Sequence, residues 1–249
     1  MLRAVIFDLD GTLYESRQFP LRLILSDPFH IGCLAAERKC RKLLRDRHFE
    51  NSSEYYEALF TLMGKGSQKR TLKARDWFYN RYMPNQVRII RDRFGAREGV
   101  KLMLKSLRDR GYKIALLSDY CFAKEKLAAC GLSVSDFDAV WESPELGGLK
   151  PRREVFLKAC AALGVKPAEA LMVGDKMSTD GGALAAGLKF IRIGKGSERR
   201  ESSAAAEISA GPRSARPILT SVSASMHWDD FLRYAKSLPA LAVKKVINF

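Results

Sequence analysis

The chain has 249 residues, of which 47% are hydrophobic and 29% charged, a composition typical of a globular protein with an ordinary core. A membrane-spanning protein is not expected, since no apolar run approaches the ~20 residues that a span requires. The five cysteines are odd in number and lack C-x-x-C spacing, which disfavours a disulfide framework and indicates the reducing cytoplasm. Because Asp8 and Asp10 interrupt the apolar N-terminal run, we expect no signal peptide.

The formal net charge of +15 is high for this length. It suggests an anionic partner, either a small phosphorylated molecule or a nucleic acid. Residues 15–97 contain 18 Lys and Arg against 9 Asp and Glu, a net charge of 18 − 9 = +9. We expect much of this charge to belong to ordinary solvated helix surface.

The first predicted element is a buried parallel strand formed by an apolar run that enters Asp8 and Asp10. The Asp-Gly sequence at Gly11 ends it in a turn. Side chains alternate along a strand, so Asp8 and Asp10 leave on the same side. Ligands of open α/β sheets bind at the carboxyl ends of the strands, and the two carboxylates are therefore candidate site residues.

Residues 15–97 have helical periodicity throughout, which is far longer than an ordinary connection. Residues 51–63 begin with Asn51 as a helix cap. A helix over 68–82 is expected to end before Pro84, with a further helix over 86–94. The sequence therefore predicts an all-helical cap subdomain at 15–97, inserted into an α/β core made of 1–14 and 98–249.

Helices and strands alternate after this segment, which predicts a doubly wound, Rossmann-like parallel sheet of the α/β class. Expected helices are 98–110, 122–130, 152–163, 183–186 and 228–238; expected strands are 113–117, 138–141, 170–173 and 190–193. Residues 194–217 are rich in Gly, Ser, Ala and Arg, which predicts a flexible insertion. An edge strand is expected at 218–222.

Polar side chains occur at four places where a predicted strand ends or a loop adjoins one. They belong to the sequences FDLDGT, LLSD, LKP and VGDKMSTD, which contain Asp8 and Asp10, Ser118 and Asp119, Lys150, and Asp175 and Asp180. Each short sequence alone has a structural explanation such as a turn or a helix cap. Together and in this order they closely resemble the signature blocks of the haloacid dehalogenase-like superfamily.

The resemblance implies a Mg²⁺-dependent phosphatase that acts through an aspartyl-phosphate. Asp8 would be the nucleophile and Asp10 the general acid/base; Ser118 and Lys150 would stabilise the phosphoryl group. Mg²⁺ would be held by the carboxylates of Asp8 and Asp175 and by the backbone carbonyl of Asp10, and Asp180 would reach it directly or through water. The implied substrate-binding residues are Gly11, Thr12, Ser118, Asp119 and Lys150.

The reaction type depends on Asp10, since an alkoxide leaving group needs a proton and a halide does not. An acid at this position therefore favours hydrolysis of a phosphate ester or transfer of a phosphoryl group. The expected partner is a small phosphorylated metabolite. Two alternatives stay open: a phosphomutase of the same superfamily, and a basic nucleic-acid-binding protein with a vestigial site.

Overall fold

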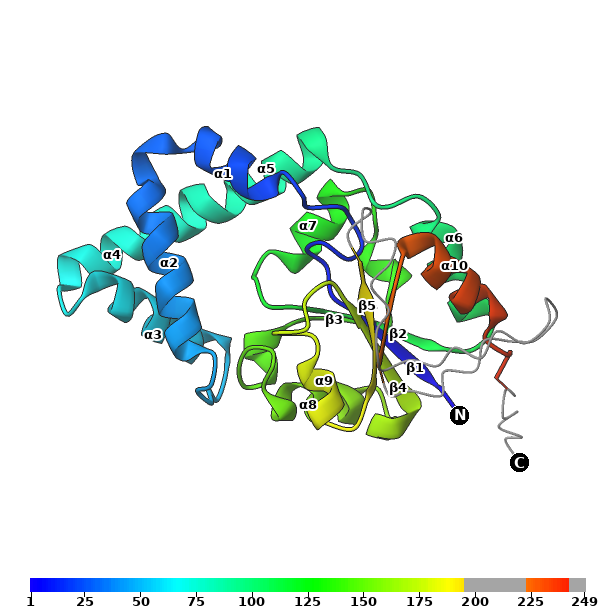
Figure 1. Cartoon of the computed structure of the whole chain (residues 1–249). Helices are drawn as coiled ribbons and strands as arrows, with labels where there is room; N and C mark the ends of the chain where they lie inside the picture. Colours follow the sequence, from blue (N-terminus) through cyan, green and yellow to red (C-terminus); the bar gives the residue numbers. More distant parts are fainter. Residues whose placement is uncertain (195–222, 242–249) are drawn as a thin grey trace, which may run out of the picture.

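The computed structural model describes residues 1–194 and 223–241, and its centre is a six-stranded, entirely parallel sheet (Figure 1). The strand order is β3-β2-β1-β4-β5-β6, which puts the first strand of the chain in the interior of the sheet. The strands are β1 (Ala4–Phe7), β2 (Lys113–Ser118), β3 (Ala139–Glu142), β4 (Ala170–Gly174), β5 (Lys189–Ile193) and β6 (Ser223–Met226). The predicted α/β class and parallel sheet are confirmed.

Helices cover both faces of the sheet, because alternate side chains of each strand point to opposite faces. Val5 and Phe7 belong to the hydrophobic cluster on one face, whereas Ala4 and Ile6 belong to the cluster on the other. The first face packs against α6 (Val100–Asp109), α7 (Ala123–Ala129) and α10 (Trp228–Ser237). The second packs against α8 (Arg153–Ala162) and α9 (Gly182–Ala185).

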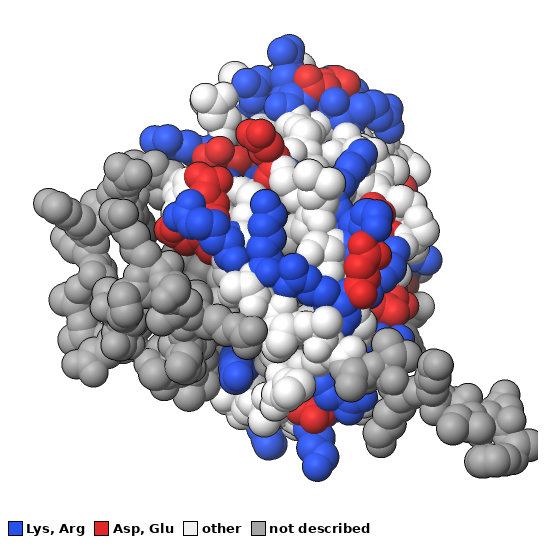
Figure 2. Space-filling model, turned by 90° about the vertical axis from the view of Figure 1, so that its right-hand side faces the viewer, with Lys and Arg blue, Asp and Glu red and all other residues white. Residues whose placement is uncertain are grey.

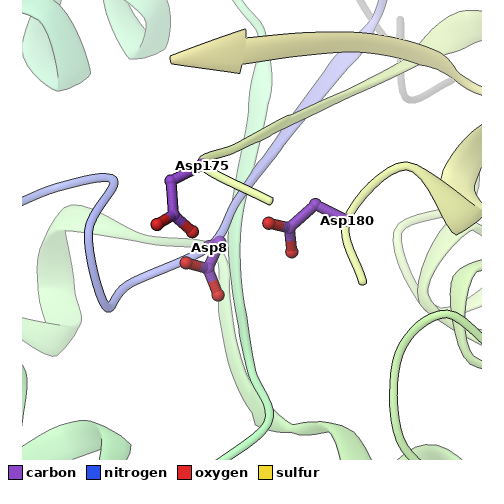
Figure 3. Close-up of side chains that lie close together, drawn as sticks. All are labelled: Asp8, Asp175 and Asp180. Carbon is purple, nitrogen blue, oxygen red and sulfur yellow. The ribbon is translucent and has the colours of Figure 1, made fainter. Parts of the chain in front are cut away.

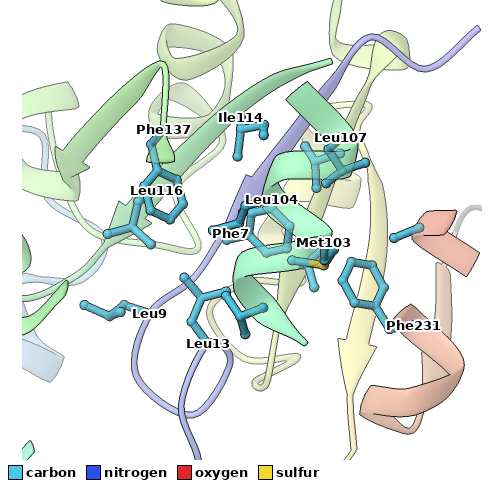
Figure 4. Close-up of a cluster of buried hydrophobic side chains, with 14 of the residues drawn as sticks. Phe7, Leu9, Leu13, Met103, Leu104, Leu107, Ile114, Leu116, Phe137 and Phe231 are labelled. Atoms are coloured by element: carbon cyan, nitrogen blue, oxygen red, sulfur yellow. The ribbon is translucent and has the colours of Figure 1, made fainter. Parts of the chain in front are cut away.

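The first of these clusters fixes the strand that carries the first acidic motif (Figure 4). Phe7 is fully buried and packs edge-to-face against Phe231 of α10, with ring centroids 6.1 Å apart. Leu9 and Leu13, which follow the strand, are also fully buried in this cluster. Apolar side chains on both sides of Asp8 therefore hold its backbone rigidly, and burial of each large one stabilises the fold by roughly 1.5–3 kcal/mol.

A helical insertion separates β1 from β2 and lies beside the α/β core (Figure 1). Its helices are α1 (Phe19–Ser26), α2 (Ile31–Leu44), α3 (Ser52–Gly64), α4 (Gln68–Trp77) and α5 (Met83–Arg93), before α6 returns to the sheet. Asn51 caps α3, as expected, by accepting a hydrogen bond from the Glu54 N–H at 3.0 Å. Most buried apolar side chains of α1–α5 form one hydrophobic cluster, joined by Cys121 and Leu149 of the core, whereas Ile90 of α5 belongs to the first cluster on the sheet.

The expected helix end before Pro84 is wrong. A π-helical turn over Phe78–Tyr82 leads from α4 directly into α5, and the Met83 N–H donates to the Phe78 carbonyl five residues earlier. Pro84 then occupies the first turn of α5, where a missing N–H costs little. The wider turn thus accommodates a proline inside one helical run from 68 to 93.

The remaining predicted elements agree with the structure to within one or two residues, apart from the helix expected at 86–94, which begins at Met83, and the edge strand. The edge strand β6 begins at Ser223, whereas the predicted strand at 218–222 and most of the predicted insertion at 194–217 lie outside the described residues. All five cysteines lie in the described part and are free thiols. Within 1–194 and 223–241, every helix is too short or too polar to traverse a bilayer.

The excess of basic residues is not spread evenly over the surface of the protein. On the face that carries α6 and α10, Lys and Arg side chains are interspersed with Asp and Glu (Figure 2). Lys105 pairs with Asp109 at 2.6 Å on α6, and Arg233 pairs with Asp230 on α10. Basic side chains on the described part of this face therefore stand beside acidic ones.

Candidate active site

The strand register brings the acidic motifs together at one edge of the sheet. Phe7 of β1 pairs with Leu116 of β2 on one side and with Val173 of β4 on the other. Because the three strands are parallel, the residues that follow them emerge side by side. Asp8 and Asp175, 167 positions apart in the chain by subtraction of their numbers, thus become neighbours.

Three carboxylates converge at this edge: those of Asp8, Asp175 and Asp180 (Figure 3). One oxygen of each lies within 4.8 Å of the others. Asp8 follows β1, Asp175 follows β4, and Asp180 comes from the turn after Asp175. Asp8 and Asp180 are 7% and 1% exposed, so water screens this negative charge poorly.

Lys150 provides the positive charge inside this cluster. Its Nζ lies 2.6 Å from Asp8 Oδ1 and 2.6 Å from Asp180 Oδ1, and it donates a third hydrogen bond to the Leu117 carbonyl at 3.0 Å. Asp119 accepts a hydrogen bond from the Lys150 backbone N–H at 3.0 Å. The lysine is therefore fixed at both its backbone and its ammonium group.

Two glycines make the approach of the carboxylates possible. A Cβ at Gly11 would lie 2.5 Å from Asp175 Oδ2, and the φ of Gly11 is +100°. A Cβ at Gly174 would lie 2.3 Å from the Asp180 carboxyl carbon. Any larger residue at either position would displace a carboxylate of the cluster.

Burial raises the pKa of the clustered carboxylates. The pKa of Asp8 rises to about 7, because burial and the Asp180 charge outweigh Lys150. Burial and the nearby Asp8 raise the pKa of Asp175 to about 6. The pKa of Lys150 lies well above its ordinary value, since Asp180 and Asp8 outweigh the effect of burial. When all are ionised the carboxylates thus carry an excess of negative charge over Lys150, and without a cation they hold protons more tightly than usual.

This excess fits a divalent cation. Three carboxylates and one ammonium sum to −3 + 1 = −2 when all are ionised. Asp175 Oδ1 is buried and has no hydrogen-bond partner among residues 1–194 and 223–241, where the nearest ammonium, that of Lys176, is 3.9 Å away. A buried carboxylate oxygen left unpaired is costly. Oxygen donors of this kind suit a hard cation such as Mg²⁺.

Asp10 has a separate environment. Lys126 Nζ lies 3.2 and 3.3 Å from its two carboxylate oxygens, and Tyr14 Oη donates to Oδ1. Burial tends to raise the pKa of Asp10, but Lys126 and Tyr14 outweigh it, so this pKa is lowered. The two neighbouring acids of the first motif therefore have opposite pKa shifts when no cation is bound: that of Asp8 is raised and that of Asp10 is lowered.

The other predicted site residues have distinct positions. The Thr12 hydroxyl donates to Asp8 Oδ2 at 3.3 Å. Ser118 is fully buried, and its hydroxyl accepts from the Tyr120 N–H and donates to the Tyr120 carbonyl, both at 3.2 Å. Asp119 and Tyr120, which follow Ser118, line the adjoining cavity.

A cavity of about 460 Å³ opens onto the carboxylate cluster and lies between the core and the helical insertion. Five predicted site residues besides Asp119 line it: Asp8, Asp10, Lys150, Asp175 and Asp180. The volume is within the range of small-molecule sites. The structure thus brings the acidic motifs and the lysine together around one cavity.

Several residues of this site were not predicted from the sequence, namely Lys126, Tyr14, Tyr120 and Arg41. Lys126 is fully buried in α7, an unusual environment for a lysine. Nothing in its local sequence separates it from the exposed Lys124 two positions earlier. Only helical periodicity, which puts Lys126 on the same face as the buried Ala123 and Leu127, hints at its burial.

Comparisons with known proteins agree with this geometry. Residues 2–187 match the family model of the haloacid dehalogenase-like hydrolases. N-acylneuraminate-9-phosphatase of Mus musculus is 32% identical over 214 residues, covering 76% of this chain and 80% of the relative. Glyceraldehyde 3-phosphate phosphatase of Methanopyrus kandleri is 28% identical over 208 residues, covering 79% and 85%.

A solved structure gives the same result for the fold. The crystal structure of the HAD phosphatase from Thermococcus onnurineus aligns with a TM-score of 0.52 and 25% identity, covering 82% of this chain and 91% of that one. The match of the family model to most of the chain, the phosphatase relatives and the site geometry all agree. The chain therefore belongs to the haloacid dehalogenase-like hydrolases and is a phosphatase, a phosphoric monoester hydrolase, of that family.

Proposed function

We propose that this protein is a Mg²⁺-dependent phosphatase that hydrolyses a small phosphorylated metabolite through an aspartyl-phosphate on Asp8. The observation that carries the proposal is the position of Asp8 at the cavity, held at 2.6 Å by Lys150 and grouped with Asp175 and Asp180. A nucleophile must be fixed in direction before it can attack. Asp8 meets this requirement, because the buried residues on both sides of it hold its backbone and Lys150 holds its side chain.

The metal would be held by the carboxylates of Asp8, Asp175 and Asp180 and by the backbone carbonyl of Asp10. When bound, Mg²⁺ supplies positive charge that offsets the repulsion between a carboxylate nucleophile and an anionic phosphate ester. The unpartnered Asp175 Oδ1 supports this assignment. Lys150 supplies the second positive charge, from a position that the carboxylates of Asp8 and Asp180 fix.

The first step forms a bond between an Asp8 oxygen and phosphorus while the bond from phosphorus to the ester oxygen breaks. Asp10 then donates its proton to that oxygen, so the alcohol leaves neutral. In the second step Asp10 takes a proton from water, the water oxygen bonds to phosphorus, and the Asp8 carboxylate is released with inorganic phosphate. Lys150 stabilises the negative charge on the phosphoryl oxygens in both steps.

The residues around Asp8 would orient the reacting groups. Thr12 donates to Asp8 Oδ2 and Asp119 anchors the Lys150 backbone. We assign Gly11, through its close approach to Asp175, to the same positioning role. Ser118 would contact a phosphoryl oxygen once its hydroxyl turns away from the Tyr120 carbonyl.

We further propose that residues 15–97 form a cap over a core made of 1–14 and 98–249. The separate hydrophobic cluster of α1–α5 supports this division, as does the cavity between the two parts. The cap would exclude water from the reacting phosphoryl group and select the substrate. The free cysteines fit a reducing compartment, and we assign the enzyme to the cytoplasm.

Two relatives are named for the phosphoesters on which they act, glyceraldehyde 3-phosphate and an N-acylneuraminate 9-phosphate. These names support a small phosphorylated sugar or sugar derivative as the substrate. Both compounds, together with other sugar phosphates, are the first to be screened. Appearance of an isomeric sugar phosphate without inorganic phosphate would instead identify a phosphomutase.

The test is hydrolysis of p-nitrophenyl phosphate by wild-type protein with Mg²⁺ and with EDTA. We expect turnover that requires the metal and that Asp8→Asn abolishes. The exposed Asp109→Asn is the matched control, because Asp109 lies on α6, pairs only with Lys105 among the described side chains and does not line the cavity. Wild-type turnover by Asp8→Asn would show that Asp8 is not the nucleophile.

A further inference from the structure

The wall of the cavity opposite the carboxylate cluster comes from the helical insertion. Its charged members are Arg38, Arg41, Lys42 and Arg45 of α2, with Arg45 immediately after the last helical residue. The other residues that the helices of the insertion contribute are neutral: Phe19, Pro20, Leu23, Tyr82 and Gln86. The described lining is therefore acidic near the reacting atoms and basic on the cap side.

The four basic residues occupy one face of α2. Their spacing of i, i+3, i+4 and i+7 stacks side chains on successive turns. We call this set, Arg38, Arg41, Lys42 and Arg45, the basic face of α2. Like charges at this spacing destabilise a helix unless negative charge lies near them.

Arg41 has such a partner within the protein. Its guanidinium lies 3.1 Å from the carboxylate of Glu37, which is 1% exposed, and packs 3.6 Å from the centre of the Tyr120 ring. Tyr120 belongs to the core, so Arg41 joins α2 to the edge of the active site. The contact fixes the orientation of the basic face relative to Asp8 and Lys150.

Arg38, Lys42 and Arg45 have no ion pair with any carboxylate in the described part of the chain. They line the cavity; Arg45 is partly buried, whereas Arg38 and Lys42 are exposed. Cations that line a concave wall concentrate anions there, since the low-dielectric walls focus the field. An anion that enters the cavity would therefore find these three cations available as partners.

This anion is distinct from the phosphoryl group that reacts. The phosphoryl group belongs beside Asp8 and Lys150 on the core wall. A cavity of about 460 Å³ holds a molecule much larger than phosphate itself. A substrate that extends from the core wall toward α2 would bring its far end to the basic face.

We propose that the basic face of α2 is a second anion subsite, and that the substrate is a phosphate monoester with another anionic group, a carboxylate or a second phosphate, at its far end. Arg38, Lys42 and Arg45 are the specificity-determining residues. The proposal rests on the proposed phosphatase function and adds the class of substrate.

The test compares matched substrates that differ in the second anion. Sorbitol 6-phosphate against 6-phosphogluconate tests a carboxylate, since both are open chains, and fructose 6-phosphate against fructose 1,6-bisphosphate tests a phosphate. We expect kcat/KM to be about tenfold or more higher for the second member of one pair, the size of one charge-assisted hydrogen bond. The pair with the larger ratio identifies the anion.

The variants Arg38→Gln, Lys42→Gln and Arg45→Gln, singly and combined, should reduce this ratio toward one. Lys39→Gln is the matched control: Lys39 is an exposed cation of the same helix that does not line the cavity, and it should leave the ratio unchanged. Equal kcat/KM within both pairs, or an unchanged ratio in the triple variant, would overturn the subsite.

A binding measurement separates this proposal from the phosphatase function. Calorimetry on Asp8→Asn with the same two pairs gives dissociation constants without turnover. A preference of about tenfold for the doubly anionic compound, lost in the triple variant, supports the subsite even if p-nitrophenyl phosphate is not hydrolysed. Metal-dependent hydrolysis of p-nitrophenyl phosphate with equal binding within each pair would reject the subsite and leave the phosphatase function in place.

Discussion

The fully buried ammonium of Lys126 bridges both carboxylate oxygens of Asp10, at 3.2 and 3.3 Å. Lys126 also lies 4.5 Å from the centre of the Tyr120 ring, and Arg41 of the insertion packs on the same ring. The proposed acid/base residue is thus connected to the helical insertion through three successive contacts, by way of Lys126 and Tyr120. Movement of α2 relative to the core would change the charge environment of Asp10.

Substitution of Lys126 should therefore alter the protonation of Asp10. In Lys126→Met the ion pair is lost and burial dominates, so the pKa of Asp10 rises. The limb of the pH profile of kcat/KM that reports Asp10 should shift to higher pH. Lys124→Met, an exposed lysine of the same helix, is the control and should keep the wild-type profile. An unshifted pH profile of kcat/KM in Lys126→Met would show that the protonation of Asp10 does not control the rate.

Removal of the proposed acid/base group should depend on the leaving group. Asp10→Asn is expected to lower kcat for an alkyl phosphate by about 10²–10⁴-fold. The decrease in the rate of the first step should be smaller for p-nitrophenyl phosphate, because an aryl oxide can leave without being protonated. Hydrolysis of the aspartyl-phosphate then limits turnover, and mass spectrometry should detect protein that carries one phosphoryl group. Equal losses for both esters without phosphorylated protein would argue against this role.

Lys150 should be essential for stability as well as for turnover. Lys150→Met leaves Asp8 and Asp180 buried without their cation, which should cost about 3–5 kcal/mol of unfolding free energy. Without that cation the pKa of both acids rises further, so the loss should be smaller near pH 5, where protonation relieves the charge, than near pH 8. Urea denaturation without metal measures the effect. Lys105→Met, an exposed lysine of α6, should lose little at either pH.

Stabilisation by Mg²⁺ should increase with pH. The pKa of Asp8 is about 7 in the folded protein against an ordinary 3.8, and that of Asp175 is about 6. The folded state thus binds protons more tightly, and the metal-free protein loses stability as pH rises from about 4 to about 7. The cation must displace these protons, so its effect on Tm should be small near pH 5 and large near pH 8.

Thermal unfolding with Mg²⁺ and with EDTA across this pH range measures the effect. Asp175→Asn should remove most of the difference at every pH, because the variant loses a charged ligand. The control is Asp109→Asn, which should retain the wild-type difference. A Tm shift that is independent of pH would contradict the assignment of the metal to the three carboxylates.

Gly11 should be required for the position of Asp175. Gly11→Ala adds backbone strain of about 1–2 kcal/mol at a φ of +100° and puts a methyl group 2.5 Å from Asp175 Oδ2. Both stability and turnover should fall. Gly66→Ala separates the two causes, since Gly66 also has a positive φ, +77°, but open space around its Cβ. It should lose only the part of the stability due to strain, about 1–2 kcal/mol, and retain turnover; a loss of turnover matching that of Gly11→Ala would show that strain alone is responsible.

The sequence by itself determined the order of the elements and the identity of the carboxylates. An apolar strand entering Asp8, and repeated alternation of strand and helix after residue 98, were sufficient for the parallel sheet, because periodicity and turn residues act locally. Local patterns were not sufficient at Pro84. There a π-helical turn lets the helix continue through the proline, and such a turn depends on side-chain packing. The carboxylates of Asp8, Asp175 and Asp180 also lie close together, as expected for residues that follow the carboxyl ends of parallel strands.

Only the tertiary structure decided which other charges face the site. Lys126 and the exposed Lys124 are equivalent in local sequence, yet only Lys126 reaches Asp10, because the packing of α7 against the sheet fixes its direction. The basic residues of α2 likewise resemble an ordinary solvated helix face until the insertion folds back over the sheet. The interaction between two charges depends on their distance in space, which their separation in the sequence does not give. The cavity and its two oppositely charged walls therefore became visible only in the folded structure.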